Sequence, residues 1–218
     1  IKPANTAGVI AAKFMEMVEE AGIPDGVVNY LPGSGASIGD YLVQNPRTRF
    51  INFTGSKDVG LHINQVAASG QPGQIWIKRV VAEMGGKNCI IVDDAADLES
   101  AATGIVASAY GFQGQKCSAC SRAIVVDAAY DEMLERVRAL TERLSLGPAV
   151  DNPDVASVID EKAYHSVMQY IEIGSREGRL VAGGRGDASF GYSIEPTIIA
   201  DVDSRARIAQ EEVFGPVL

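Results

Sequence analysis

The sequence predicts an α/β fold in which parallel sheets are flanked by helices. Along all 218 residues, stretches with apolar residues at helical spacing alternate with short apolar runs typical of buried strands. Strands separated by helices of about 10–15 residues favour βαβ units and therefore parallel pairing. A hydrophobic content of 46%, with neither a fixed-period repeat nor a low-complexity tract, is typical of a globular chain with its own core.

The elements of the first part of the chain follow from these patterns. Apolar residues recur at helical spacing in Thr6–Ala21, with Thr6 expected as the N-cap and Gly22 at the helix stop. The elements expected after it are a strand Val27–Leu31, a helix Ala36–Gln44, a strand Arg49–Phe53, a helix Lys57–Ala68 and a strand Gln74–Glu83.

The second part of the chain continues the alternation after the glycine pair Gly85-Gly86, where we place a domain boundary between residues 1–85 and 86–218. Because the first and last residues fall in strand-like runs without caps, we expect a segment of a longer polypeptide. The expected elements are strand Asn88–Val92, helix Leu98–Phe112, strand Ala123–Val126, helices Tyr130–Leu144 and Glu161–Glu177, and strand Leu180–Ala182.

The charge and cysteine content exclude several classes of protein. The chain carries 28 acidic and 19 basic residues, a net charge of −9, which argues against a nucleic-acid or anionic-membrane surface. No apolar run approaches the ~20 residues of a membrane span. Three cysteines are too few for a disulfide scaffold, so we expect a cytoplasmic protein.

Two glycine-containing turns follow strands and open helices. Gly33–Gly39 has the spacing GxGxxxG, which differs from the dinucleotide-binding GxGxxG, and Phe53–Ser56 repeats the strand–glycine–helix arrangement. Such turns bring backbone N–H groups to a phosphate. They also serve as plain strand-to-helix turns that need positive φ, with Ser56 as an N-cap. Both interpretations stay open from the spacing alone.

Cys117 is the candidate nucleophile. Its neighbour Lys116 can lower the pKa of the thiol, which makes the thiolate available. The spacing Cys117-x-x-Cys120 also fits a redox pair, or half of a zinc site whose other ligands are not found at suitable spacing. Cys89 and Cys120 are expected to be small buried hydrophobes.

Glu83 is the candidate general base. It ends a hydrophobic strand just before the glycine pair, where desolvation would raise the pKa of its carboxyl. A surface glutamate at a strand end is the alternative. His62 and His165 lie in helical stretches without a nucleophilic serine nearby, and a solvated or core position is expected for each.

Four segments together resemble one family, the aldehyde dehydrogenase superfamily. Glu83–Lys87 (EMGGK) resembles its glutamate signature and Phe112–Cys117 (FQGQKC) its cysteine signature. Phe53–Gly60 (FTGSKDVG) is similar to its cofactor-helix motif, and Glu211–Pro216 (EEVFGP) to its late cofactor motif. The resemblance implies an aldehyde dehydrogenase-like fold, with residues 1–85 as the C-terminal part of the NAD(P)-binding domain and 86–218 as the N-terminal part of the catalytic domain.

The resemblance also implies the reaction. Cys117 attacks an aldehyde, the resulting thiohemiacetal gives a hydride to the cofactor, and Glu83 activates water to hydrolyse the thioester. The backbone N–H of Cys117 helps to stabilise the oxyanion. The implied binding residues are Lys2, Gly55, Ser56, Glu212 and Phe214 for the cofactor, and Lys116 and Ser118 for the substrate carboxylate.

The cofactor implied is NAD, and NADP is not excluded, because Asn5 stands where many members carry an acidic residue. No metal is implied. Within the superfamily, Arg49–Ser56 and Gly114–Arg122 most resemble the subgroup that oxidises L-glutamate γ-semialdehyde to glutamate in proline and arginine breakdown.

The family also implies a homo-oligomeric parent enzyme with a small-molecule substrate. Its second oxyanion donor, an asparagine, lies upstream of Ile1, so we expect the segment alone to be inactive. Three alternatives remain: another subfamily, a catalytically silent binding or structural domain of this fold, or a CxxC redox module.

Overall fold

The computed structural model describes residues 1–189 and 191–218 and divides the chain into two compact units. Unit 1 is Ile1–Gly85 and unit 2 is Gly86–Leu218. The division falls between the two adjacent glycines at which the sequence places its domain boundary. Each unit is described by itself.

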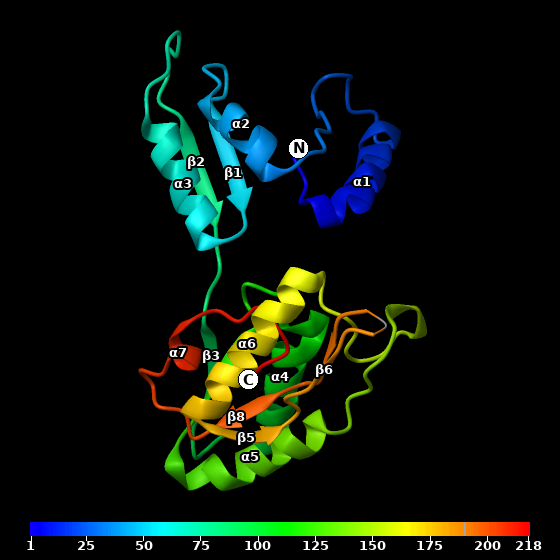
Figure 1. Cartoon of the computed structure of the whole chain (residues 1–218), viewed down its shortest axis with the longest axis vertical. Helices are drawn as coiled ribbons and strands as arrows, with labels where there is room; N and C mark the ends of the chain where they lie inside the picture. The colour runs from blue at the N-terminus through cyan, green and yellow to red at the C-terminus, as the bar shows by residue number, and fades with distance from the viewer. Residues whose placement is uncertain (190) are drawn as a thin grey trace. The chain divides into compact units, whose positions relative to one another are not determined.

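Unit 1 contains one two-stranded parallel sheet with helices beside it (Figure 1). Phe50 lies opposite Arg79 and Thr54 opposite Glu83, so the carboxyl ends of both strands meet at one edge. The backbone N–H of Gly55 donates to the carbonyl of Glu83 at 3.0 Å and extends this pairing by one residue. The elements are α1 (Gly8–Glu20), α2 (Asp40–Gln44), β1 (Phe50–Thr54), α3 (Lys57–Ala68) and β2 (Arg79–Glu83).

Three expectations in unit 1 are wrong. Val27–Leu31 is not a strand in the described chain: its backbone hydrogen bonds to Ile1 are those of Asn29 and Leu31. Thr6 is no N-cap, because it lies inside a short 3₁₀ helix that precedes α1. The strand expected from Gln74 begins only at Arg79.

Unit 2 combines a parallel strand pair, β3–β4, with the antiparallel pairs β5–β8 and β6–β7 (Figure 1). Its helices are α4 (Leu98–Tyr110), α5 (Asp127–Thr141), α6 (Glu161–Glu177) and α7 (Arg207–Gln210). Its strands are β3 (Asn88–Val92), β4 (Cys120–Val125), β5 (Arg179–Ala182), β6 (Gly186–Asp187), β7 (Ser193–Ile194) and β8 (Ile198–Ala200).

The core of unit 2 consists of two clusters of buried apolar side chains. The first joins α4 and α5 to the β3–β4 pair and includes Ile105, Tyr110 and Met133. The second lies between α6 and the antiparallel strands and includes Val167 and Ile194. Burial of this kind is the main favourable term in folding, so unit 2 has a well-packed body on which a site can be held.

The expected elements of unit 2 match closely where the apolar periodicity is strong. β3 and α6 have the expected bounds, and α4 begins at the expected residue. Four short elements were not predicted, because they are too brief to carry a periodic signal: β6, β7, β8 and α7.

Candidate functional site

The loop that carries Cys117 leaves α4 through a tight reversal. Phe112, Gln113 and Gly114 have φ values of 55°, 57° and 67°, three consecutive residues in the left-handed region. Only glycine adopts this conformation without strain, so the fold around the loop must hold the first two in place. One such contact is visible: the side-chain oxygen of Gln115 accepts the backbone N–H of Ile159 at 2.9 Å.

Cys117 itself is exposed, and its backbone is anchored. The side-chain amide of Asn88 donates to its carbonyl oxygen at 2.6 Å. In the described part of the chain no acceptor takes its backbone N–H, which leaves that donor available to an oxyanion on a substrate bound at the sulfur. The residue after it, Ser118, is exposed as well.

The other two cysteines differ from each other. Cys120 is 3% exposed, its Sγ donates to the carbonyl of Arg122 at 3.4 Å, and burial raises the pKa of its thiol. These features argue against a reactive pair with Cys117. Cys89 is exposed, contrary to expectation, because its strand position in β3 faces outward.

The late cofactor motif lies against the cysteine loop. Glu212 and Phe214 line a small crevice with Lys116, Gly114 and Gly86. A Cβ at Gly114 would collide with the carbonyl group of Gly215, so the two motifs are in backbone contact. Phe214 is held at φ 58° with a side chain 44% exposed, which presents its ring outward.

The carboxylate of Glu212 has a defined partner in this crevice. It accepts the backbone N–H of Gly86 at 3.1 Å. Lys87 follows directly, and desolvation lowers the pKa of its ammonium to about 8, helped by the nearby charge of Arg122 and opposed by Glu212. The carboxylate of Glu212 is therefore a half-buried anion near the Lys87 ammonium, and one of its oxygens accepts a backbone hydrogen bond.

Lys116 lies with these cofactor-motif residues. Its Nζ is 3.3 Å from where a Cβ at Gly111 would lie, so the ammonium covers the end of α4. It shares the crevice with Glu212. Thus unit 2 brings together Lys116, Glu212 and Phe214, while Cys117 and Ser118 stand exposed beside them on the same loop.

The predicted residues of unit 1 lie at two places. Ser56 caps α3 by accepting the backbone N–H of Val59 at 3.4 Å, as expected, and Gly55 precedes it at the strand edge. Lys2 donates to the carbonyl oxygens of Pro3 and Gly33, next to the glycine-rich turn. The helix N-terminus and the ammonium are the groups that bind phosphate and ribose oxygens.

Glu83 ends β2 with an exposed side chain. Of the two positions considered for Glu83, desolvated or at the surface, unit 1 shows the surface position, because the neighbouring Thr54 and the glycines that follow leave the carboxylate uncovered. The carboxylate is accessible to water.

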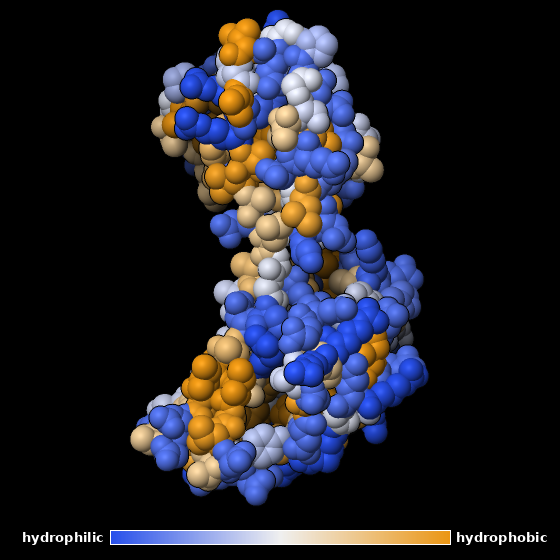
Figure 2. Space-filling model, turned by 90° about the vertical axis from the view of Figure 1, so that its left-hand side faces the viewer, coloured by the Kyte–Doolittle hydropathy of each residue, from blue (hydrophilic) through white to orange (hydrophobic). Residues whose placement is uncertain are grey.

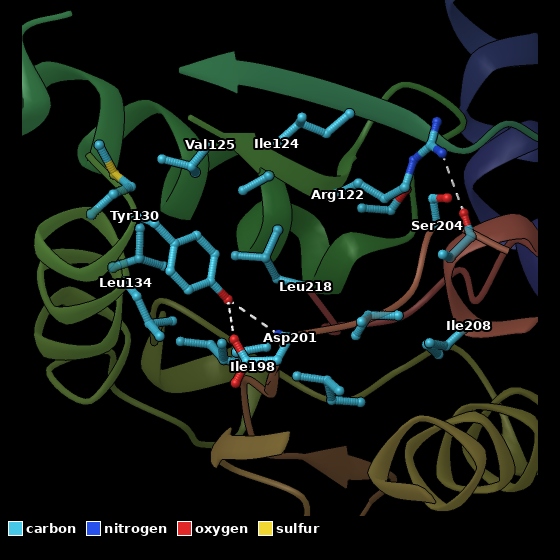
Figure 3. A pocket seen from close by; sticks show the side chains of 18 of the residues that line it. Arg122, Ile124, Val125, Tyr130, Leu134, Ile198, Asp201, Ser204, Ile208 and Leu218 are labelled. Carbon is cyan, nitrogen blue, oxygen red and sulfur yellow. Dashed lines mark hydrogen bonds between the residues drawn. The ribbon is translucent and has the colours of Figure 1, made fainter. Parts of the chain in front are cut away.

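A larger cavity of about 560 Å³ lies elsewhere in unit 2 (Figure 3). Its walls come from β4, α5 and β8, with Tyr130 donating to Asp201 at 2.7 Å inside it. It holds no candidate nucleophile. Among the described residues no group of three or more His, Cys, Asp or Glu side chains could hold a metal, and no helix is long and apolar enough to cross a membrane.

The whole chain, residues 1–218, matches the model of the aldehyde dehydrogenase family. The chain belongs to this family. Its relatives narrow the comparison to one kind of member: it is 62% identical to the 1-pyrroline-5-carboxylate dehydrogenase of Geobacillus thermodenitrificans (strain NG80-2), over 100% of this chain and 42% of that protein.

Solved structures agree with this comparison. A 1-pyrroline-5-carboxylate dehydrogenase from Thermus with bound NAD superposes with a TM-score of 0.97 and 56% identity, over 100% of this chain and 42% of that one. Proline utilization A (PutA) from Bdellovibrio bacteriovorus gives a TM-score of 0.94 and 43% identity, over 100% and 23%. The predicted family and α/β fold are confirmed.

Two residues at the site, Asn88 and Arg122, were not predicted from the sequence. Asn88 is the first residue of β3, and a polar side chain at that position was a usable signal for a contact outside the strand. Arg122 lies inside β4, and a charged residue within a strand was a usable signal for a hydrogen-bond partner.

Proposed function

We propose that the protein carrying this chain oxidises an aldehyde to a carboxylate with NAD through a thioester on Cys117. The observation that carries the proposal is the exposed thiol on a loop with an anchored carbonyl and a free backbone N–H. L-Glutamate γ-semialdehyde is the proposed substrate, which the names of the relatives support. The chain spans about two fifths of their length, so activity and substrate are proposals for the protein that contains it.

The chemistry begins at the sulfur. The thiolate of Cys117 attacks the aldehyde carbon, and the oxygen of the thiohemiacetal takes up the negative charge facing the Cys117 N–H. NAD, when bound, accepts the hydride that leaves this carbon, which converts the adduct to a thioester. Glu83 would then take a proton from water, the hydroxide adds to the thioester carbonyl, and the C–S bond breaks to give the carboxylic acid and the Cys117 thiolate; the acid loses its proton to solvent and leaves as the carboxylate.

The covalent chain permits Glu83 to serve this step. Two residues, Met84 and Gly85, separate it from Gly86, and backbone spans at most about 3.6 Å per residue. A Cβ at Gly86 would lie 3.1 Å from the carbonyl oxygen of Cys117, so Gly86 borders the nucleophile. The exposed carboxylate of Glu83 keeps contact with the water that it activates.

The residues present fit NAD. The exposed N-terminus of α3, capped by Ser56 and preceded by Gly55, suits the pyrophosphate, and Lys2 suits the adenosine ribose. Glu212 has a carboxylate oxygen for the nicotinamide ribose, and the exposed ring of Phe214 suits that end of the cofactor. Unit 1 is accordingly proposed as part of the NAD(P)-binding domain and unit 2 as part of the catalytic domain.

Substrate selection is assigned to the nucleophile loop. The hydroxyl of Ser118 is exposed next to the thiol, and Lys116 adds a positive charge to the same loop. Hydroxyl and ammonium donors suit the α-carboxylate of a semialdehyde. We further propose that the enzyme forms homo-oligomers and works in the cytoplasm, in keeping with its three free cysteines.

The test compares two exposed thiols in the gene product that carries this chain. Cys117→Ala should lower NADH production from the semialdehyde by more than about a thousandfold, because the covalent step is lost. Cys89→Ala removes an equally exposed thiol and should leave the rate within twofold. Near-normal turnover in Cys117→Ala would refute the mechanism, and absence of turnover in the unsubstituted protein would favour a silent binding domain. The 218-residue chain alone should give less than a tenth of the rate.

A further inference from the structure

Arg122 makes an unusual pair of contacts in unit 2. From its position in β4, one guanidinium nitrogen donates to the carbonyl of Lys87 at 2.6 Å. Another donates to the carbonyl of Ala209 in α7 at 3.4 Å. Figure 3 shows the second contact as the dashed line that leaves Arg122. Arg122 thus joins two chain segments that lie about 120 residues apart in the sequence.

These two contacts belong to a closed ring of hydrogen bonds. Lys87 directly follows Gly86, whose N–H donates to the carboxylate of Glu212 at 3.1 Å. Ala209 stands three residues before Glu212. The ring therefore runs from Glu212 to Gly86, along the chain to Lys87, across Arg122 to Ala209, and back along the chain to Glu212.

α7 is fixed at its other end as well. The side chain of Glu177 accepts the backbone N–H groups of Arg207 at 3.1 Å and Ile208 at 2.8 Å. A four-residue helix held at both ends moves as a unit with the residues that follow it. Glu177 contacts only the start of α7 in these hydrogen bonds, whereas Arg122 contacts both α7 and Lys87, next to Gly86.

Arg122 also lies in a charged and partly buried environment. The charges of Arg122 and Glu212 both act on Lys87, and the Nε of Arg122 is buried without a partner among the described residues. Leaving a buried guanidinium donor unpaired costs free energy. The position is therefore poorly explained by stability alone.

We propose that Arg122 is a positioning residue for the cofactor: it holds the Gly86 and α7 segments so that Glu212 presents its carboxylate to the nicotinamide ribose. This inference rests on the proposed function. Arginine suits the task because its planar fork reaches two carbonyls in fixed directions, whereas the lysine ammonium is a point donor on a flexible stem.

The test begins with Arg122→Lys, which keeps the charge and loses the fork. In the gene product, calorimetry should show NAD binding weakened about tenfold, while the rate of Cys117 alkylation by iodoacetamide stays within twofold. Arg138→Lys is the matched control, because Arg138 forms its ion pairs with two exposed carboxylates, Glu135 on α5 and Glu142 directly after it. Arg122→Gln, which keeps one amide donor, serves if the lysine variant does not fold.

A double-mutant cycle with Glu212→Ala identifies the route. If Arg122 acts through Glu212, Arg122→Lys should change NAD affinity less than twofold in the Glu212→Ala background. An equal loss in both backgrounds would overturn the proposal, as would unchanged NAD affinity in Arg122→Lys.

Hydrogen–deuterium exchange separates this inference from the proposed function, because it needs no cofactor. Arg122→Lys should speed exchange in the peptide that contains Gly86, and slow exchange there in both proteins would overturn the ring. If exchange responds as expected but the unsubstituted protein binds no NAD, the cofactor role falls with the proposed function.

Discussion

Unit 2 has a packed interior, whereas unit 1 has almost none. Both clusters of buried apolar side chains belong to unit 2. In unit 1 the buried apolar side chains are Val43 and Ala67, and α1 buries none of its residues. Figure 2 shows hydrophobic residues at the surface of both units; in unit 1, Val9, Ile10 and Ile75 are more than three quarters exposed.

The difference separates the two halves of the proposed chemistry. The proposed nucleophile and its anchor Asn88 stand on the packed body, where a fixed geometry would favour attack on the aldehyde. The proposed base, Glu83, ends a strand of unit 1.

The strongest challenge to this division is the substitution Glu83→Gln. Acylation at Cys117 should survive, while hydrolysis of the thioester should slow by about 10²–10⁴, because the amide cannot accept the proton from water. Stopped-flow absorbance should therefore show a burst of NADH followed by almost no turnover. Steady turnover at the unsubstituted rate would place deacylation entirely in unit 2.

Truncation of matched isoleucines tests the packing directly. Ile105→Ala in α4 empties a site that is 0% exposed and should cost about 2–5 kcal/mol. Ile51→Ala in β1 removes a half-buried side chain and should cost less than half as much. Urea denaturation, followed by hydrogen–deuterium exchange in peptides of each unit, measures the loss of stability in both variants. Equal losses would contradict the difference in packing between the units.

Ser118→Ala sharpens the assignment of substrate recognition to unit 2. A hydrogen bond to a charged group contributes about 1.5–3 kcal/mol, so KM for glutamate semialdehyde should rise about tenfold or more. An uncharged aliphatic aldehyde of similar length provides the comparison and should be affected less than threefold. Parallel increases for both would remove Ser118 from carboxylate binding.

The smallest expected effect concerns the pH dependence of stability at Lys87. Its pKa is about 8 in the folded chain and 10.5 for the free side chain. Between these values the unfolded chain binds more protons, so the free energy of unfolding rises with pH. Lys87→Met should therefore stabilise the chain at pH 7, and the gain should shrink from pH 8 to 10.5 in thermal melts. A gain that does not vary with pH would mean that Lys87 is not desolvated.

The sequence predicted what local patterns determine. α3, β3 and α6 have the expected bounds because their apolar periodicity or their caps are encoded in adjacent residues. Val27–Leu31 has the composition of a strand, yet a strand also needs a neighbour, which no local pattern reveals. The exposure of Glu83 depends on the residues across the sheet, so the sequence left its surface and desolvated positions both open.

The site shows the same limit. Its motifs supplied Cys117, Glu212 and Phe214, because signature residues lie close together in the sequence. The contacts of Asn88 and Arg122 join segments 29 and 87 residues apart, and only the folded chain brings such partners together.

The backbone contact between Gly114 and Gly215 has a consequence for biosynthesis. The ribosome synthesises Gly114, in the loop that carries Cys117, 101 residues before Gly215, which contacts it. At about 5–20 residues per second, Cys117 spends roughly 5–20 s outside its finished setting. During that interval the loop lacks the backbone contact that holds it, so the geometry around Cys117 is complete only after residue 215 has been synthesised.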